Sequence, residues 1–177
     1  MIKTLLHIVF AFLLLLAAGC NRPAEPDQQV LDDSASLRET LAETNKLLLS
    51  AEQQEIEDFI ERYGWQMQQT GSGLRYMIYQ AGEGPVAQAG MTAVLHYQVH
   101  LLTGDLVYSS EEDGPLEFQI GRGGVEGGLE EAILLLRQGD HARVIMPAHL
   151  AHGLPGDGVK IPKRATIVYD LELKELK

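Results

Sequence analysis

The feature that most constrains the fold is a series of short segments in which apolar and polar residues alternate. The longest is MTAVLHYQVHLL at 91–102, and shorter ones stand at 74–80, 116–120, 142–147 and 165–176. A period of two is typical of a strand with one buried and one solvent-facing side. Glycine-rich and polar turns separate these segments, which favours antiparallel pairing. The sequence therefore predicts a many-stranded antiparallel sheet.

One helix is expected among these strands. Residues 126–136 read EGGLEEAILLL, which is amphipathic at the helical period. Glu130 and Glu131 stand early in it, where the helix dipole favours acids. The turn Gln138-Gly139-Asp140 follows. The predicted fold class is α+β, an antiparallel sheet with one short helix against it.

The N-terminal residues are expected to be a targeting segment. Lys3 precedes the apolar run IVFAFLLLLAA at 8–18, which is short for a transmembrane helix and typical of a signal peptide. The run ends in LAAGC, which resembles a bacterial lipobox. In lipoproteins the signal peptide is cut before that cysteine, whose thiol receives a diacylglycerol. We expect residues 1–19 to be a lipoprotein signal peptide and Cys20 to be the lipidation site.

The cysteine count is consistent with this reading. Cys20 is the single cysteine of the chain, so intrachain disulfides and multi-cysteine metal sites are excluded. A diacylglycerol with further acyl chains such as palmitate gives stable membrane attachment. The expected location is the cell envelope, at the outer membrane or the periplasmic face. The alternative is a plainly secreted protein that retains an unpaired thiol.

A polar stretch follows the cysteine. Residues 20–36 contain two prolines and scattered acids and are predicted to be a flexible tether. Ser36 is then expected to cap a helix, with Glu39 three residues later completing a capping box.

Beyond the tether, the apolar residues recur at a helical period. They predict one or two helices over 37–63, broken near Asn45 or Ser50, with Gly64 as the stop. We assign 37–70 to this helical segment. Its apolar stripe is expected to dock onto the neighbouring domain or to form a dimer or partner contact.

Charge and motifs exclude several function classes. The net charge of −11 disfavours nucleic acid, because phosphate neutralisation needs a cationic surface. His96 and His100 would be roughly 13 Å apart on one strand, and proline and glycine around His149 and His152 oppose a helix that would bring those two together. The sequence contains no HExxH or GxSxG motif and no phosphate-loop lysine. We expect no metal and no cofactor.

Several short motifs coincide in order over about 100 residues. They are HY at 96–97, TGDLVYSS, PLEFQIGRGGVEGGLEE, HLAHG and IPKRATIVYDLEL. The segment 73–175 resembles the FKBP-type peptidyl-prolyl cis-trans isomerases. The resemblance implies a twisted antiparallel sheet wrapped on a short helix within a domain at 71–177. It also implies an apolar pocket between sheet and helix that binds an Xaa-Pro bond without a cofactor, nucleophile or metal.

The resemblance assigns ten residues to the substrate pocket. Three of them, Tyr97, Val125 and Ile161, match the family pattern. The others depart from it: Val107-Tyr108 replaces Phe-Asp, Leu116 replaces Phe, Glu126 replaces Ile, Leu129 replaces Trp, His152 replaces Tyr, and Tyr169 stands where Phe is usual. These exchanges remove aromatic contact area and the family acid. They are expected to affect rate more than fold.

The predicted function is a peptidyl-prolyl isomerase that assists the folding of exported, proline-containing clients at the envelope and also acts as a chaperone. Uncatalysed Xaa-Pro isomerisation is slow enough to limit folding. One alternative is a catalytically weak FKBP-like chaperone, and another is an assembly lipoprotein of an envelope machine. The lipobox together with NKLLLSAEQQEIEDFI and VYSSEEDGPL is similar to the gliding-motility-associated FKBP-type lipoproteins of Bacteroidota.

Overall fold

The computed structural model describes residues 28–177, with side chains described from residue 36. The expected signal peptide, Cys20 and the tether up to residue 27 lie outside the described residues. The chain divides into two units between Asn45 and Lys46, and Lys46–Lys177 is a compact one. Among the residues that the structure describes, no helix is both long and apolar enough to cross a bilayer.

Helix α2 is a single helix over Gln28–Tyr63, so it begins earlier than predicted and has no break. Residues 28–36 of the expected tether are helical, and the capping box at Ser36 is wrong because this residue lies inside the helix. Neither proline nor glycine occurs within Gln28–Tyr63. Hydroxyl groups also bond back to carbonyls of the preceding turn, as Thr40 does to Ser36 at 2.9 Å, so polar residues do not interrupt the helix.

The predicted stop at Gly64 is confirmed. Gly64 has φ +63°, and its N–H donates to the carbonyl of Glu61 at 3.0 Å. The N–H of Trp65 reaches the carbonyl of Ile60 at 3.1 Å. Glycine adopts this left-handed conformation without steric cost, which closes the helix end. The helical segment thus ends seven residues before the predicted boundary at 70.

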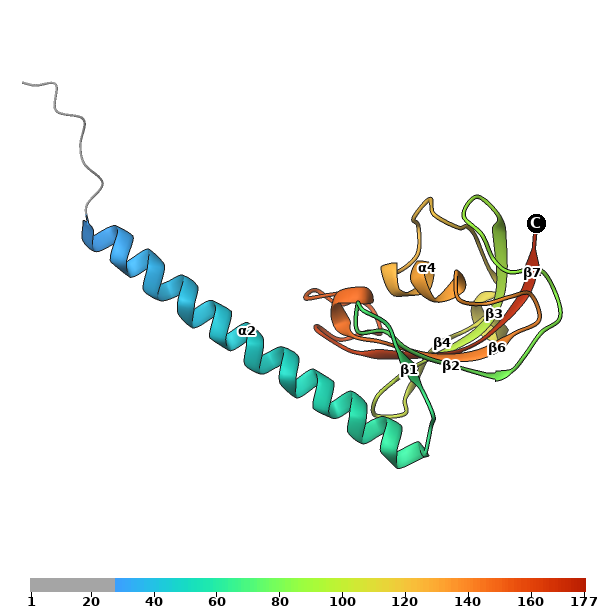
Figure 1. Cartoon of the computed structure of the whole chain (residues 1–177), viewed down its shortest axis with the longest axis horizontal. Helices are drawn as coiled ribbons and strands as arrows, with labels where there is room; N and C mark the ends of the chain where they lie inside the picture. Colours follow the sequence, from blue (N-terminus) through green and yellow to red (C-terminus); the bar gives the residue numbers. More distant parts are fainter. Residues whose placement is uncertain (1–27) are drawn as a thin grey trace, which may run out of the picture. The chain divides into compact units, whose positions relative to one another are not determined.

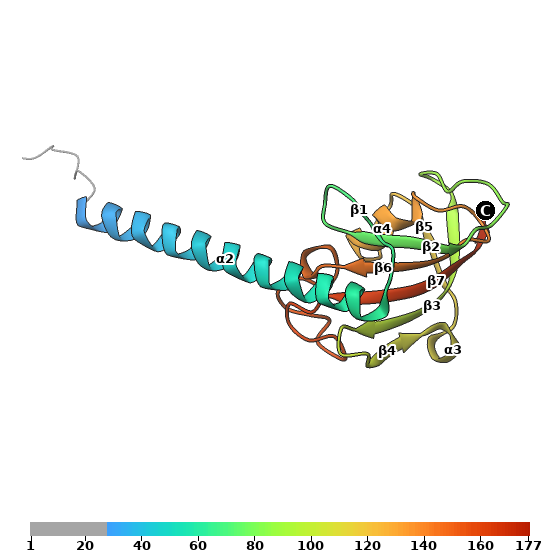
Figure 2. The same ribbon diagram turned by 60° about the horizontal axis from the view of Figure 1, so that its bottom comes forward.

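The second unit contains a seven-stranded sheet in the order β1-β2-β6-β7-β3-β4, with β5 also paired to β3. Every pairing is antiparallel, and Figure 2 shows the strands side by side. The strands are β1 (Gln68–Gln69), β2 (Arg75–Gln80), β3 (Thr92–Leu101), β4 (Leu106–Ser109), β5 (Leu116–Gln119), β6 (His141–Met146) and β7 (Ile167–Leu176). The predicted α+β fold is confirmed: five of the seven strands fall on the five alternating segments, and β1 and β4 are short strands outside them.

Short helices complete this unit. They are α3 (Ser110–Asp113), α4 (Gly127–Ile133) and the 3-10 turn η1 (Ala148–Leu150). Helix α4 is the predicted helix, shortened at its C-terminal end, and it lies against the concave side of the curved sheet (Figure 1). Its buried residues Leu129, Ala132 and Ile133 join the main hydrophobic core.

Both faces of the central strands are covered. In β7, Tyr169 packs in the main core under α4, whereas its neighbour Val168 packs with Ile145, Ile56 and Phe59 in a second core. Successive strand residues point to opposite faces, so the last turns of α2 cover the face opposite α4. The C-terminal part of the apolar stripe, with Ile56 and Phe59, therefore docks onto its own domain, as one of the two sequence interpretations proposed.

Candidate functional site

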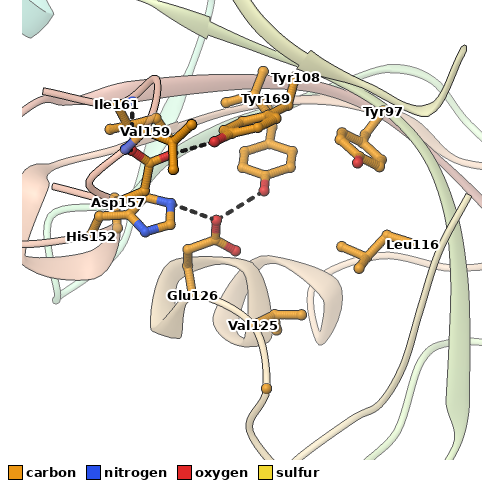
Figure 3. A pocket seen from close by; sticks show the side chains of 13 residues that line it. Tyr97, Tyr108, Leu116, Val125, Glu126, His152, Asp157, Val159, Ile161 and Tyr169 are labelled. Atoms are coloured by element: carbon orange, nitrogen blue, oxygen red, sulfur yellow. Dashed lines mark hydrogen bonds and ion pairs between the residues drawn. The ribbon is translucent and has the colours of Figure 1, made fainter. Parts of the chain in front are cut away.

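A cavity of about 580 Å³ opens between the sheet and the segments on its concave side. Its lining comes from β3, β4, β5 and β7, from the start of α4, and from the loop between η1 and β7 (Figure 3). Thirteen residues line it: Tyr97, Val99, Tyr108, Leu116, Gly124, Val125, Glu126, Ala151, His152, Asp157, Val159, Ile161 and Tyr169. Eight of the ten predicted site residues are thus brought together.

Val107 and Leu129 do not reach this cavity, in contrast to the expectation for them. Both are buried in the main core. Val107 alternates with Tyr108 along β4 and faces the other way. Leu129 is completely enclosed beside the strands, because its side chain follows the buried face of α4. At this position the family pattern would place a larger aromatic side chain.

Five lining residues were missed by the sequence reasoning: Val99, Gly124, Ala151, Asp157 and Val159. Val99 follows Tyr97 at the strand period, so the alternation itself was a usable signal. Asp157 and Val159 belong to an irregular loop. No periodicity in the sequence reports where such a side chain points.

The walls of the cavity are apolar and aromatic. The rings of Tyr97 and Tyr169 lie with their centroids 6.0 Å apart, and Leu116, Val125 and Ile161 complete the surface. The Tyr97 hydroxyl has no hydrogen-bond partner among residues 36–177. Burial, with the charges of Asp113 and Glu126, raises the pKa of Tyr97, so this hydroxyl stays a donor for a bound ligand.

Asp157 organises the loop at the rim. Its Oδ1 accepts the backbone N–H groups of Val159 at 2.8 Å, Lys160 at 3.0 Å and Ile161 at 2.7 Å, and its Oδ2 accepts the hydroxyl of Tyr108. Burial opposes ionisation, but the hydrogen bonds outweigh it and lower the pKa of Asp157 to about 2.

The same pair corrects an expectation about charge. The sequence indicated that the pocket had lost the family acid, because Tyr108 stands in its place. In the structure that tyrosine donates to a carboxylate from a residue 49 positions away. The rim therefore keeps an acid, although a different segment supplies it.

Glu126 places a second carboxylate inside the cavity. Its Oε1 accepts the Tyr169 hydroxyl at 3.1 Å and lies 3.1 Å from Nε2 of His152 (Figure 3). Burial, and then the Glu126 carboxylate, raise the pKa of the Tyr169 phenol above its ordinary value. His152 is therefore part of the cavity wall, where the resemblance placed it, and its Nε2 is in contact with the Glu126 carboxylate.

Helix α2 positions the loop that carries these residues. Oε1 of Glu52 accepts the N–H of Ala148 at 2.7 Å and the hydroxyl of Thr166 at 2.9 Å. The first bond fixes the start of the loop and the second fixes the approach to β7. The loop bearing His152 and Asp157 is thus held at both ends by one carboxylate.

The two histidines of the HLAH motif serve different parts of the structure. Nε2 of His149 lies 3.0 Å from the carbonyl of Ser72 on the exposed surface, whereas His152 faces the cavity. Within the described part of the chain, no three His, Cys, Asp or Glu side chains are grouped as metal ligands would be.

Comparison with known proteins identifies the family. The model of the FKBP-type peptidyl-prolyl cis-trans isomerase family matches residues 84–174, just over half of the 177 residues. The chain belongs to the FKBP-type peptidyl-prolyl cis-trans isomerases. The family resemblance seen in the sequence is confirmed.

Individual relatives agree with this family. An FK506-binding protein of Streptomyces anulatus is 40% identical over 95 residues, covering 52% of this chain and 77% of that protein. An FKBP-type isomerase of Haemophilus influenzae is 32% identical over 114 residues, covering 64% of this chain but only 46% of the relative. The crystal structure of FkpA from Escherichia coli has a TM-score of 0.63 at 24% identity, over 97% of this chain and 81% of that one, which shows a shared FKBP fold.

Proposed function

We propose that this protein is an active peptidyl-prolyl isomerase that assists proline-containing client proteins in the cell envelope. The observation that carries the proposal is the apolar, aromatic cavity between sheet and α4, in a chain of this isomerase family. Its volume of about 580 Å³ lies within the range of ligand sites.

The chemistry needs little from the cavity beyond shape and polarity. The barrier to rotation of a peptide bond is about 18–20 kcal/mol, because the planar amide must lose its resonance. The twisted amide has less charge separation than the planar one, so apolar walls such as Leu116, Val125 and Ile161 favour it. The Tyr97 hydroxyl is available to hold a flanking carbonyl. No proton, nucleophile or metal takes part.

The test is a refolding assay in which proline isomerisation limits the rate. We expect the purified protein to accelerate the slow phase, and Ile161→Trp, which fills the cavity, to abolish the acceleration without unfolding the domain. If wild type leaves the slow phase unchanged while still suppressing aggregation, the protein is a chaperone of FKBP fold and not an isomerase.

The envelope location rests on the signal-peptide pattern and the lipobox. We expect a lipid anchor on Cys20, and therefore incorporation of labelled palmitate by cells that express the protein. Cys20→Ala should abolish both the labelling and the membrane attachment. Labelling that persists in this variant would refute the anchor.

A contact through α2 with a second copy or a partner is a further part of the proposal. Leu37, Leu41 and Leu48 are 60%, 53% and 40% exposed, and they recur along one side of the helix. Such a stripe suits an assembly lipoprotein of an envelope machine, including one of the gliding-motility type. Leu41→Lys with Leu48→Lys should reduce the mass measured by sedimentation or release a co-purified partner, while peptide isomerisation persists.

A further inference from the structure

The cavity is acidic at its centre. Among its thirteen lining residues are the carboxylates Glu126 and Asp157, and none is a lysine or arginine. A third carboxylate, Asp113, lies near enough to raise the pKa of both Tyr97 and Tyr108. One lysine, Lys160, lies at the rim with Nζ 4.7 Å from the centre of the Tyr108 ring. A bound peptide therefore meets negative charge inside the cavity.

The two lining carboxylates differ in whether an oxygen atom remains available to a ligand. Asp157 accepts four hydrogen bonds from its own surroundings, so it is satisfied without a ligand. Glu126 has both of its polar contacts on Oε1: the Tyr169 hydroxyl donates a hydrogen bond to it, and Nε2 of His152 lies 3.1 Å from it. Its Oε2 has no partner among residues 36–177. Figure 3 shows this carboxylate rising from the start of α4 into the cavity.

A ligand in this cavity covers a carboxylate that is only 14% exposed. Covering a charged group with apolar atoms removes its remaining water without replacing the hydrogen bonds. A lysine or arginine side chain instead offers a charge-assisted hydrogen bond to Oε2. An acidic side chain adds repulsion. Tyr169 is neutral, and within residues 36–177 His152 is the other titratable side chain paired with Glu126.

We propose that Glu126 makes the pocket selective for Xaa-Pro segments with a lysine or arginine directly beside the proline. The proposal rests on the isomerase function proposed above and names the substrate class of the same site. Since Glu126 stands where the family pattern has isoleucine, this selectivity is a property of this chain and not one implied by its family. We expect a preference of about fivefold to tenfold over a neutral side chain of equal length.

The experiment measures kcat/KM of the full-length protein on two tetrapeptide series. One series varies the residue before proline and the other the residue after it, each with lysine, norleucine and glutamate. Norleucine matches the lysine stem without its charge. We expect lysine to exceed norleucine and norleucine to exceed glutamate in at least one series. The lysine preference should shrink as salt screens the charge.

Two variants locate the effect. Glu126→Gln keeps the length of the side chain and one acceptor oxygen, and it should bring the lysine-to-norleucine ratio to about one. Glu117→Gln removes the same charge from an exposed residue of β5 that pairs with Lys177 outside the cavity, and it should keep the preference. Equal loss in both variants would mean that only net charge matters, which overturns the proposal.

The outcomes separate this inference from the function on which it rests. Equal rates on all peptides of both series would overturn the charge selectivity while the isomerase stands. Absence of catalysis on every peptide would refute the isomerase.

In that case, calorimetric binding of the same peptides tests the charge selectivity. Tighter binding of the lysine peptide by wild type than by Glu126→Gln supports it, and equal binding overturns it. If Glu126→Gln fails to fold, the salt dependence of the wild type is the test. A lysine preference that does not change with salt concentration would overturn the proposed charge selectivity.

Discussion

At the scale of single residues, the cavity contains two carboxylates with different tasks. Asp157 is saturated by Tyr108 and three backbone N–H groups and so shapes the rim loop. Glu126 is held by Tyr169 and His152 and keeps one oxygen for a ligand. Both arrangements arise from exchanges at positions where the family pattern has other residues. The residues that depart from the family pattern, Tyr108, Glu126 and His152, therefore form polar contacts within the cavity and do not merely reduce its apolar surface.

The low pKa of Asp157 predicts an acid-sensitive contribution to stability. Its folded-state pKa of about 2 lies below the ordinary value of 3.8. The contribution is therefore complete above pH 4 and is lost as the pH falls from about 4 to about 2. We expect Asp157→Asn to lower the free energy of unfolding at pH 7 by about 1 kcal/mol, after allowance for solvent screening. Urea unfolding at several pH values measures this difference, which should vanish near pH 2; a constant difference would contradict the assignment.

Two tyrosines that lie side by side on the sheet wall of the cavity, Tyr97 and Tyr169, predict opposite phenotypes. Tyr97→Phe removes a hydroxyl that has no partner among residues 36–177, so kcat/KM should fall about fivefold while stability stays the same. Tyr169→Phe removes the hydroxyl that donates to Glu126, and should cost about 1 kcal/mol of unfolding free energy. Peptide kinetics and thermal unfolding of both variants check the pair. Equal loss of stability in both would contradict it.

At the scale of elements, the loop from η1 to β7 depends on a helix far away in the sequence. Glu52 of α2 accepts hydrogen bonds from Ala148 and Thr166 at the two ends of this loop. The neighbouring Arg75, which is buried, pairs with Glu57 of the same helix at 2.6 Å. The final turns of α2 thus stabilise the segment that carries His152, Asp157 and Ile161 as well as the second core.

This connection predicts that Glu52→Ala loosens the loop. The substitution leaves the Ala148 N–H and the Thr166 hydroxyl without their acceptor, which costs about 1–3 kcal/mol for a buried donor. We expect faster amide hydrogen exchange over 148–161 and a higher KM for peptides. The amides at the centre of β7 should exchange as slowly as in the wild type. Glu55 is exposed on the same helix, so Glu55→Ala is the control. Amide hydrogen exchange over 148–161 in this variant should match that of the wild type.

At the scale of the whole molecule, Lys46–Lys177 is one unit in which the sheet has a core on each face. The end of α2 is part of that unit, although the sequence predicted a helical segment over 37–70 and a separate domain over 71–177. A boundary drawn there would remove Ile56 and Phe59 and expose Ile145 and Val168. The unit Lys46–Lys177 contains both cores intact.

The two-sided core predicts how truncation and core mutation differ. Removing residues 1–45 leaves both cores complete, so the melting temperature should change by no more than a few degrees. Phe59→Ala empties part of the second core and should cost about 3–5 kcal/mol. Thermal unfolding of both proteins is the measurement. A large loss of stability on truncation would show that the first unit contributes to the folded domain.

The sequence by itself determined five strands from their alternating segments, the helix after the glycine-rich turn and the stop at Gly64, and its resemblance to the family assigned eight of the thirteen cavity residues. Only the tertiary structure decided that Asp157 meets Tyr108 across 49 positions and that Glu126 meets Tyr169 across 43. The same holds for the second core under α2 and for the burial of Leu129. The physical reason is that a periodic pattern reports which face of its own segment is buried. It carries no information about which distant side chain that face, or an irregular loop, will contact.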